Sequence, residues 1–86
     1  MSKGLGSTQV GVLVMLRDHP DGLIMYDIAG PSYSRQSSAR RALARLRAAG
    51  LVSGDTFFPN MQGRPVLWEI TDAGRTWLAG HPKAVE

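Results

Sequence analysis

Apolar residues near the start of the chain recur at the three- and four-residue spacing of a helix. Val10 and Leu13 show this spacing, and Ser7 or Thr8 just before them can cap a helix N-terminus. The turn residues of 19–22, which include a proline and a glycine, end the pattern. Val14 belongs to the same stripe, and three further apolar residues widen it: Val12, Met15 and Leu16. The helix should therefore be buried on most of its sides.

Two more helices are predicted before the middle of the chain. Residues 23–24 can form a short extended piece, and Met25–Ala29 resembles a brief helix that ends at Gly30 and the following proline. The segment Ser34–Ala49 is dominated by strong helix formers, with Gly50 as its terminating residue. A helical wheel gives this third helix one inward side: Ala39, Ala42, Leu43, Leu46 and Ala49.

The pattern then changes to that of a β-hairpin. Residues 51–52 and 56–58 are typical of an extended strand, which we expect Ser53-Gly54-Asp55 to interrupt. Residues 66–70 form the second strand, and residues 59–65 supply a long tip between the two.

A last helix completes the domain. Thr71 is placed to cap a helix over residues 72–79, with an aspartate in its favourable first turn. The order predicts one α+β domain over residues 7–79, between a flexible N-terminus (1–6) and a flexible C-terminal tail (80–86). A short helix, a tight turn and a basic helix also match the helix-turn-helix plan, whose second helix enters the major groove of DNA.

Basic residues are concentrated in the third predicted helix. The net charge is +3 and the isoelectric point about 10.0. Five arginines and no acid lie between Pro31 and Gly50, whereas Asp18, Asp21 and Asp27 precede this stretch. The wheel places long cations and small residues on the side away from the core: Ser37, Ser38, Arg40, Arg41, Ala44, Arg45, Arg47 and Ala48. This asymmetry indicates a polyanionic partner.

Other classes of protein find little support in the sequence. The chain has no cysteine, its two histidines are far apart, and its carboxylates are scattered among turns and caps. We therefore expect no enzyme activity, no cofactor and no metal. The longest apolar run, Val12–Leu16, is far shorter than the roughly 20 residues that cross a bilayer. Without a signal peptide at the N-terminus, we expect a cytoplasmic protein that joins the nucleoid when bound to DNA.

The same residues resemble a known family. The segment 38–52, SARRALARLRAAGLV, looks like the recognition helix and first wing strand of bacterial winged helix-turn-helix regulators. Gly63-Arg64-Pro65, followed by residues 68–75, WEITDAGR, resembles the wing tip, second wing strand and following helix of the MarR- and PadR-like groups. The resemblance covers residues 8–79 and implies a three-helix core, a wing of two or three strands and a C-terminal helix. Those regulators usually carry extra helices for dimerisation and a ligand pocket, which have no counterpart here.

The resemblance and the charge pattern together imply a double-stranded DNA interface. Arginine can bind guanine edges or phosphate with two hydrogen bonds, and serine near a helix start can donate to phosphate or bases. Ser38, Arg40 and Arg41 fit the family pattern best, and Arg45 and Arg47 fit backbone contacts. A solvated helix whose arginines only keep the protein soluble is the alternative, but such a face would normally include glutamates. The candidate set in this helix is Ser34, Arg35, Gln36, Ser37, Ser38, Arg40, Arg41 and Arg45.

The hairpin tip supplies the second set of candidates. Gln62 and Arg64, with Asn60 as a weaker candidate, can lie along the DNA backbone or enter a narrow minor groove. A polar turn shaped by Gly63 would be the simpler explanation for these residues.

Other functions and assemblies stay open at this point. A winged-helix module that docks an acidic protein should expose an apolar patch, for which Leu5, Val10, Met15 and Trp77 are candidates. RNA binding is a third option. One such domain covers about one DNA half-site, so we expect a homodimer through the N- or C-terminal helix, with Val12 and Met15 on the outside.

Overall fold

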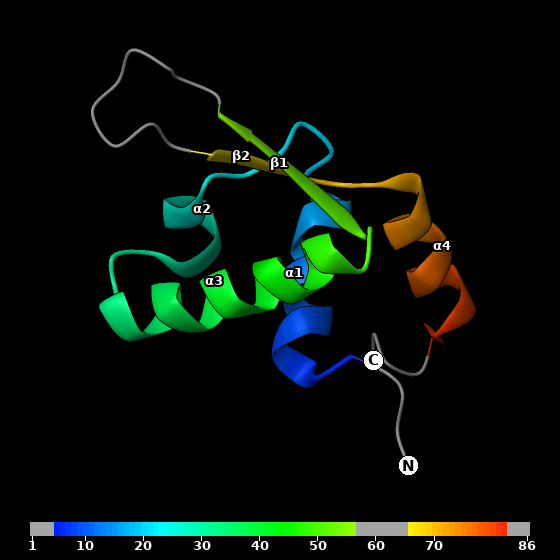
Figure 1. Ribbon diagram of the computed structural model, residues 1–86, viewed down its shortest axis with the longest axis horizontal. Helices are drawn as coiled ribbons and strands as arrows, with labels where there is room; N and C mark the ends of the chain where they lie inside the picture. Colours follow the sequence, from blue (N-terminus) through cyan, green and yellow to red (C-terminus); the bar gives the residue numbers. More distant parts are fainter. Residues whose placement is uncertain (1–4, 57–65, 83–86) are drawn as a thin grey trace.

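Four helices and a two-stranded antiparallel sheet make up the part of the chain that the structure describes, residues 5–56 and 66–82 of a computed structural model (Figure 1). The elements are α1 (Ser7–Asp18), α2 (Met25–Ala29), α3 (Tyr33–Ala48), β1 (Val52–Thr56), β2 (Val66–Ile70) and α4 (Asp72–Gly80). This is the predicted α+β order. No helix among the described residues is long and apolar enough to span a membrane.

The helix starts differ in detail from the predicted ones. Gly6, not Ser7 or Thr8, is the N-cap of α1. The Gln9 side-chain oxygen accepts a hydrogen bond from the Gly6 N–H at 3.1 Å. Ser32 caps α3 by accepting from the Arg35 N–H at 3.4 Å, so the helix already includes Tyr33. A side chain three residues into α1 thus replaces the expected serine or threonine cap.

The core lies where α1 crosses α3. Leu13, Leu16, Leu43 and Leu46 are fully buried there, and Trp68 and Trp77 pack against the cluster from its edge. Two expectations about this region were wrong. Ala49 is exposed because it caps the end of α3 instead of continuing the helix. Val12 is buried with the core, so only Met15 of the two expected outer residues of α1 is exposed.

The first strand is continuous, contrary to the expected interruption. β1 runs through Ser53-Gly54-Asp55 and pairs with β2 in antiparallel register. Gly54 lies opposite Trp68, and a Cβ built on it would come within 2.7 Å of the indole. The indole covers the glycine, so this weak strand former is held in the sheet by a cross-strand neighbour. Leu23 adds a short bridge on the other side of Trp68, with N–O distances of 2.9 and 2.8 Å.

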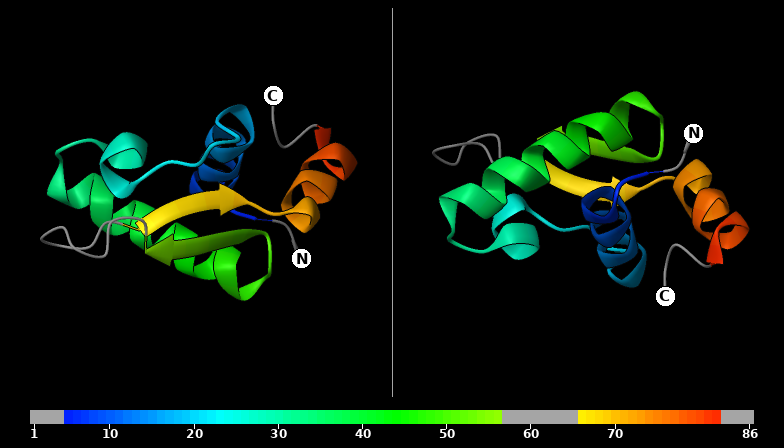
Figure 2. Two further views of the ribbon diagram at one scale, coloured as in Figure 1. Left: turned by 90° about the horizontal axis from the view of Figure 1, so that it is seen from above. Right: turned by 90° about the horizontal axis from the view of Figure 1, so that it is seen from below.

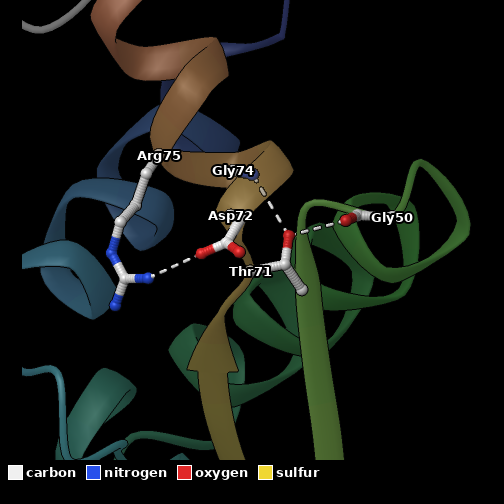
Figure 3. A network of polar contacts seen from close by, with 5 residues as sticks. All are labelled: Gly50, Thr71, Asp72, Gly74 and Arg75. Carbon is white, nitrogen blue, oxygen red and sulfur yellow. Dashed lines mark hydrogen bonds and ion pairs between the residues drawn. The ribbon is translucent and has the colours of Figure 1, made fainter.

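The end of α3, the end of β2 and the start of α4 meet at one tight point, which we call the Thr71 junction (Gly50, Leu51, Ile70, Thr71 and Gly74). Thr71 Oγ1 donates to the Gly50 carbonyl at 2.7 Å and accepts from the Gly74 N–H at 3.1 Å (Figure 3). Gly50 has a φ of 80°, the left-handed conformation expected of a helix-ending glycine. A Cβ on Gly74 would overlap the Leu51 carbonyl oxygen and lie 2.6 Å from Ile70 Cγ1. The junction therefore fixes α3 relative to the sheet and α4.

Candidate nucleic-acid interface

Helix α3 presents all its arginines to solvent. Two alanines and two leucines of α3 are buried in the core, which turns the opposite side of the helix outward. Every arginine of the helix is exposed: Arg35, Arg40, Arg41, Arg45 and Arg47. In residues 5–54 and 66–82, whose side chains the structure describes, the ion pairs are Arg17–Asp18, at 3.1 Å, and Arg75–Asp72, at 3.3 Å. Neither involves α3, so the helix carries five positive charges that no described carboxylate neutralises.

Four of the exposed arginines lie along two edges of α3. Arg40 and Arg47 lie seven residues apart on one edge, and Arg41 and Arg45 lie four apart toward the other. Small side chains occupy the surface between them, with Ala44 and Ala48 exposed and Ser37 half-buried. This outer surface (the arginine face: Ser37, Arg40, Arg41, Ala44, Arg45, Arg47 and Ala48) lets a flat or grooved partner approach the helix backbone.

The edge toward α1 forms a concave site. Arg41, Arg45 and Ser38 line a hollow of about 360 Å³ together with Thr8 and Gln9 of α1. In the view from below, α1 begins beside the middle of α3 (Figure 2, right). Thr8 and Gln9 were not among the sequence candidates, since only the crossing of the two helices brings them to Arg41.

Ser34 and Arg35 do not line the hollow beside Arg41 but a second concave site, to which Ser38 also contributes. This groove of about 570 Å³ lies between α1, α2 and the first turns of α3, and its lining includes Met15 and Ile28. A helical wheel places Arg35 on the inward side of α3. The first buried residue of the helix is Ala39, however, so Arg35 stays exposed at the groove. Its place on a DNA surface stays a prediction.

Gln36 has a bonding partner within the protein. Its side-chain Nε2 donates to the Gly30 carbonyl at 2.6 Å, and the residue is half-buried. This bond ties the start of α3 to the turn after α2, where Gly30 has a φ of 70°. Gln36 therefore supports the geometry of the helix-turn-helix, and its contact with DNA stays a prediction.

The hairpin-tip candidates lie outside the described residues. Asn60, Gln62 and Arg64 belong to this segment, so their contribution stays a prediction.

Among the described aromatics, Tyr33 at the start of α3 is 81% exposed and Tyr26 on α2 is 60% exposed. Tyr26 was missed as a surface residue, although its wheel position opposite the buried Ile28 would have indicated it.

The described residues form no metal site beside the arginine face. No group of three or more His, Cys, Asp or Glu side chains in residues 5–54 and 66–82 is arranged to hold a metal ion. All side-chain nitrogen and oxygen atoms that are buried in this part of the chain have a hydrogen-bond partner. The arginine face is thus the main concentration of unneutralised charge in the described part.

Comparison with known proteins identifies the fold. No protein-family model matches the sequence, and no curated protein gives a significant match. A MarR-family transcriptional regulator from Silicibacter pomeroyi superposes with a TM-score of 0.73 at 26% identity, over 95% of this chain and 53% of that one. ZitR from Lactococcus lactis gives 0.73 at 23% identity, over 98% and 55%. A PadR-family transcription regulator from Clostridium difficile R20291 gives 0.70 at 18% identity, over 91% and 85%.

These structures confirm the predicted architecture. The chain has the winged-helix fold of MarR and PadR regulators, with α1–α3 as the helical core and β1–β2 as the strands of the wing. It spans about half the length of the MarR-family regulator and of ZitR.

Proposed function

We propose that this chain binds double-stranded DNA and acts in transcriptional regulation, with α3 in the major groove. The observation that carries the proposal is the arginine face, on which no described acid neutralises the guanidinium groups. A surface of this kind gains affinity by neutralising phosphates and releasing their counterions. The shared fold with proteins described as transcriptional regulators supports the same assignment.

The residues divide by their position on the helix. Arg40 and Arg41 flank the small side chains Ala44 and Ser37, where the helix backbone can approach base edges closely. Arginine there can bind guanine O6 and N7 with two hydrogen bonds, which supplies sequence preference. Arg45 and Ser38 lie nearer to α1 and suit phosphate contacts.

Three further elements complete the proposal. Arg64 and Gln62 of the hairpin tip bind the flanking backbone or minor groove, as a wing does. Two copies of the chain bind as a homodimer, because one domain covers only about a half-site. The protein acts in the cytoplasm, at the nucleoid.

Most of the residues expected to form a protein-docking patch are buried or partly buried. Among its candidate patch residues, Val10 is 7% exposed and Leu5 and Trp77 pack partly buried against the core. Met15, 38% exposed, is the one that stays open in the described part of the chain. A single side chain is far smaller than the apolar patches that mark protein interfaces.

A salt-series titration tests the proposal. Fluorescence anisotropy of a labelled random-sequence duplex should show affinity falling with salt at a log–log slope of several units. On random-sequence DNA, Arg40 and Arg41 contribute by neutralising phosphates and not by reading bases. The Arg40→Ala/Arg41→Ala double variant should therefore bind roughly 50-fold more weakly near 0.1 M salt, since each lost phosphate neutralisation changes the slope by about 0.9.

The matched control is the Arg17→Ala/Arg75→Ala double variant. It removes the same charge from exposed arginines of α1 and α4, outside the arginine face. Equal losses in the two double variants, or no binding at low salt by the folded wild-type protein, would contradict the proposal.

A further inference from the structure

The concave site between the first turn of α1 and the middle of α3 has a composition of its own. We call it the α1–α3 hollow, and it is lined by Thr8, Gln9, Ser38, Arg41, Ala42 and Arg45, with a volume of about 360 Å³. Its residues come from two helices about 30 positions apart in the sequence, which pack directly against each other (Figure 2, right).

The lining is rich in donors and contains no carboxylate. Arg41 and Arg45 lie one helical turn apart and share the hollow, and Ser38 and Thr8 add hydroxyl groups. Neither arginine pairs with an acid among the described residues. The first turn of α1 also lacks acidic residues, so the partial positive charge of this helix end is not offset. Two like charges in one concavity favour a ligand with several acceptor oxygens and negative charge.

We infer that the α1–α3 hollow binds one phosphate of the DNA backbone. This inference rests on the proposed function. Arg41 links the arginine face to the hollow, because it belongs to the arginine face and also lines the hollow. A strand that borders the major groove around α3 therefore reaches the hollow without leaving the protein surface. Arg45, Ser38, Thr8 and Gln9 then position the duplex and read no bases, so their contribution is the same for every sequence.

Gln9→Glu places a carboxylate in the hollow with little other change. The glutamate oxygen can still accept the Gly6 N–H that Gln9 accepts at 3.1 Å, and an acid in the first turn suits the helix end. Its unfolding free energy should therefore be equal to or above that of the wild type. Affinity for random-sequence duplex should fall roughly tenfold near 0.1 M salt, and the log–log salt slope should fall by about one. A purely structural role for Gln9 would not change the slope.

Thr76→Glu is the matched control, because it adds the same charge to an exposed position of α4. Equal effects of Gln9→Glu and Thr76→Glu on affinity and slope would overturn the inference. If the Arg40→Ala/Arg41→Ala variant still lost binding in that case, the proposed function would stand without the hollow. Failure of the wild type to bind DNA would overturn both.

A second arm distinguishes a DNA phosphate from a free one. Inorganic phosphate is titrated at constant ionic strength while the NMR signals of the Thr8 and Gln9 amides are followed. A DNA-phosphate seat predicts only weak, millimolar shifts, and a larger change when duplex is added. Saturation by micromolar phosphate, together with unchanged DNA affinity in Gln9→Glu, would assign the hollow to a free anion and overturn the inference.

Discussion

The Thr71 junction, just beyond the end of α3, and the arginine face along α3 use polar groups in opposite ways. At the junction, Thr71 Oγ1 donates to the Gly50 carbonyl at 2.7 Å, just beyond the end of α3, and accepts from the Gly74 N–H of α4 at 3.1 Å. On the arginine face, the guanidinium groups of α3 have no described carboxylate as a partner. One end of the helix is thus satisfied within the protein, while its outer side keeps its charge available.

This difference separates residues that stabilise the fold from residues that we propose contact DNA. A variant at the junction should lower the unfolding free energy, and lose DNA binding only because the protein unfolds. A variant on the arginine face should lose DNA binding while the unfolding free energy stays constant. The predictions below test this separation, from the largest expected effect to the smallest.

Ala44→Glu should produce the largest loss of DNA affinity without unfolding the protein. Ala44 is exposed between the arginines, so a glutamate there would face phosphates, and like charges brought together cost several kcal/mol. We expect a loss of about 3 kcal/mol or more, roughly 100-fold, measured by anisotropy. Ala73→Glu, at an exposed position of α4, should change affinity little. Similar losses in both variants would place the DNA surface elsewhere or nowhere.

Gly74→Ala should give the largest loss of stability. The new methyl group would overlap the Leu51 carbonyl oxygen and crowd Ile70, and neither can move without disturbing the junction. We expect the unfolding free energy in urea to fall by about 3 kcal/mol. Gly11→Ala is the control: this helical glycine of α1 has nothing within 4 Å of its built Cβ, so alanine should stabilise by about 1 kcal/mol. A stable Gly74→Ala protein would refute the close packing at the junction.

Thr71→Ala should have a smaller effect of the same kind. It removes the N-cap of α4 and the bond to the Gly50 carbonyl, at a cost of about 1–2 kcal/mol in unfolding free energy. Thr71→Ser keeps the hydroxyl and should retain most of that stability. DNA affinity, measured well below the unfolding transition, should be the same in both variants. A drop in affinity without a drop in stability would break the separation between the two regions.

Much of the fold could be predicted from local sequence signals. The apolar spacing of α3, the position of Gly50, the cap at Thr71 and the second strand at residues 66–70 all follow from short-range chemistry, and the structure confirms them. The resemblance to winged-helix regulators rested on the same segments. It is confirmed at the level of the fold.

Two of the errors occurred where tertiary packing decided the outcome. The glycine in β1 indicated a break, but Trp68 from the opposite strand covers Gly54 and keeps the strand regular. Val12 looked like an outer residue because the pattern of one helix alone does not show that this position joins the buried core of the folded domain.

The candidate site shows the same limit. The arginine pattern indicated the exposed side of α3 correctly, since exposure there follows from a single helical wheel. The bond from Gln36 to Gly30 and the placement of Thr8 beside Arg41 depend on how elements pack, which spacing along one helix does not contain.

NMR mapping of the DNA-binding surface tests the central claim most directly. The ¹⁵N-labelled protein is titrated with a short duplex at low salt, and amide shifts are followed for every assigned residue. We predict that the largest shifts cluster on the arginine face and on the first turn of α1, with α4 unchanged. Shifts centred on α4 or on the groove beside Met15, or no shifts at all, would contradict the assignment of α3 as the DNA-binding helix.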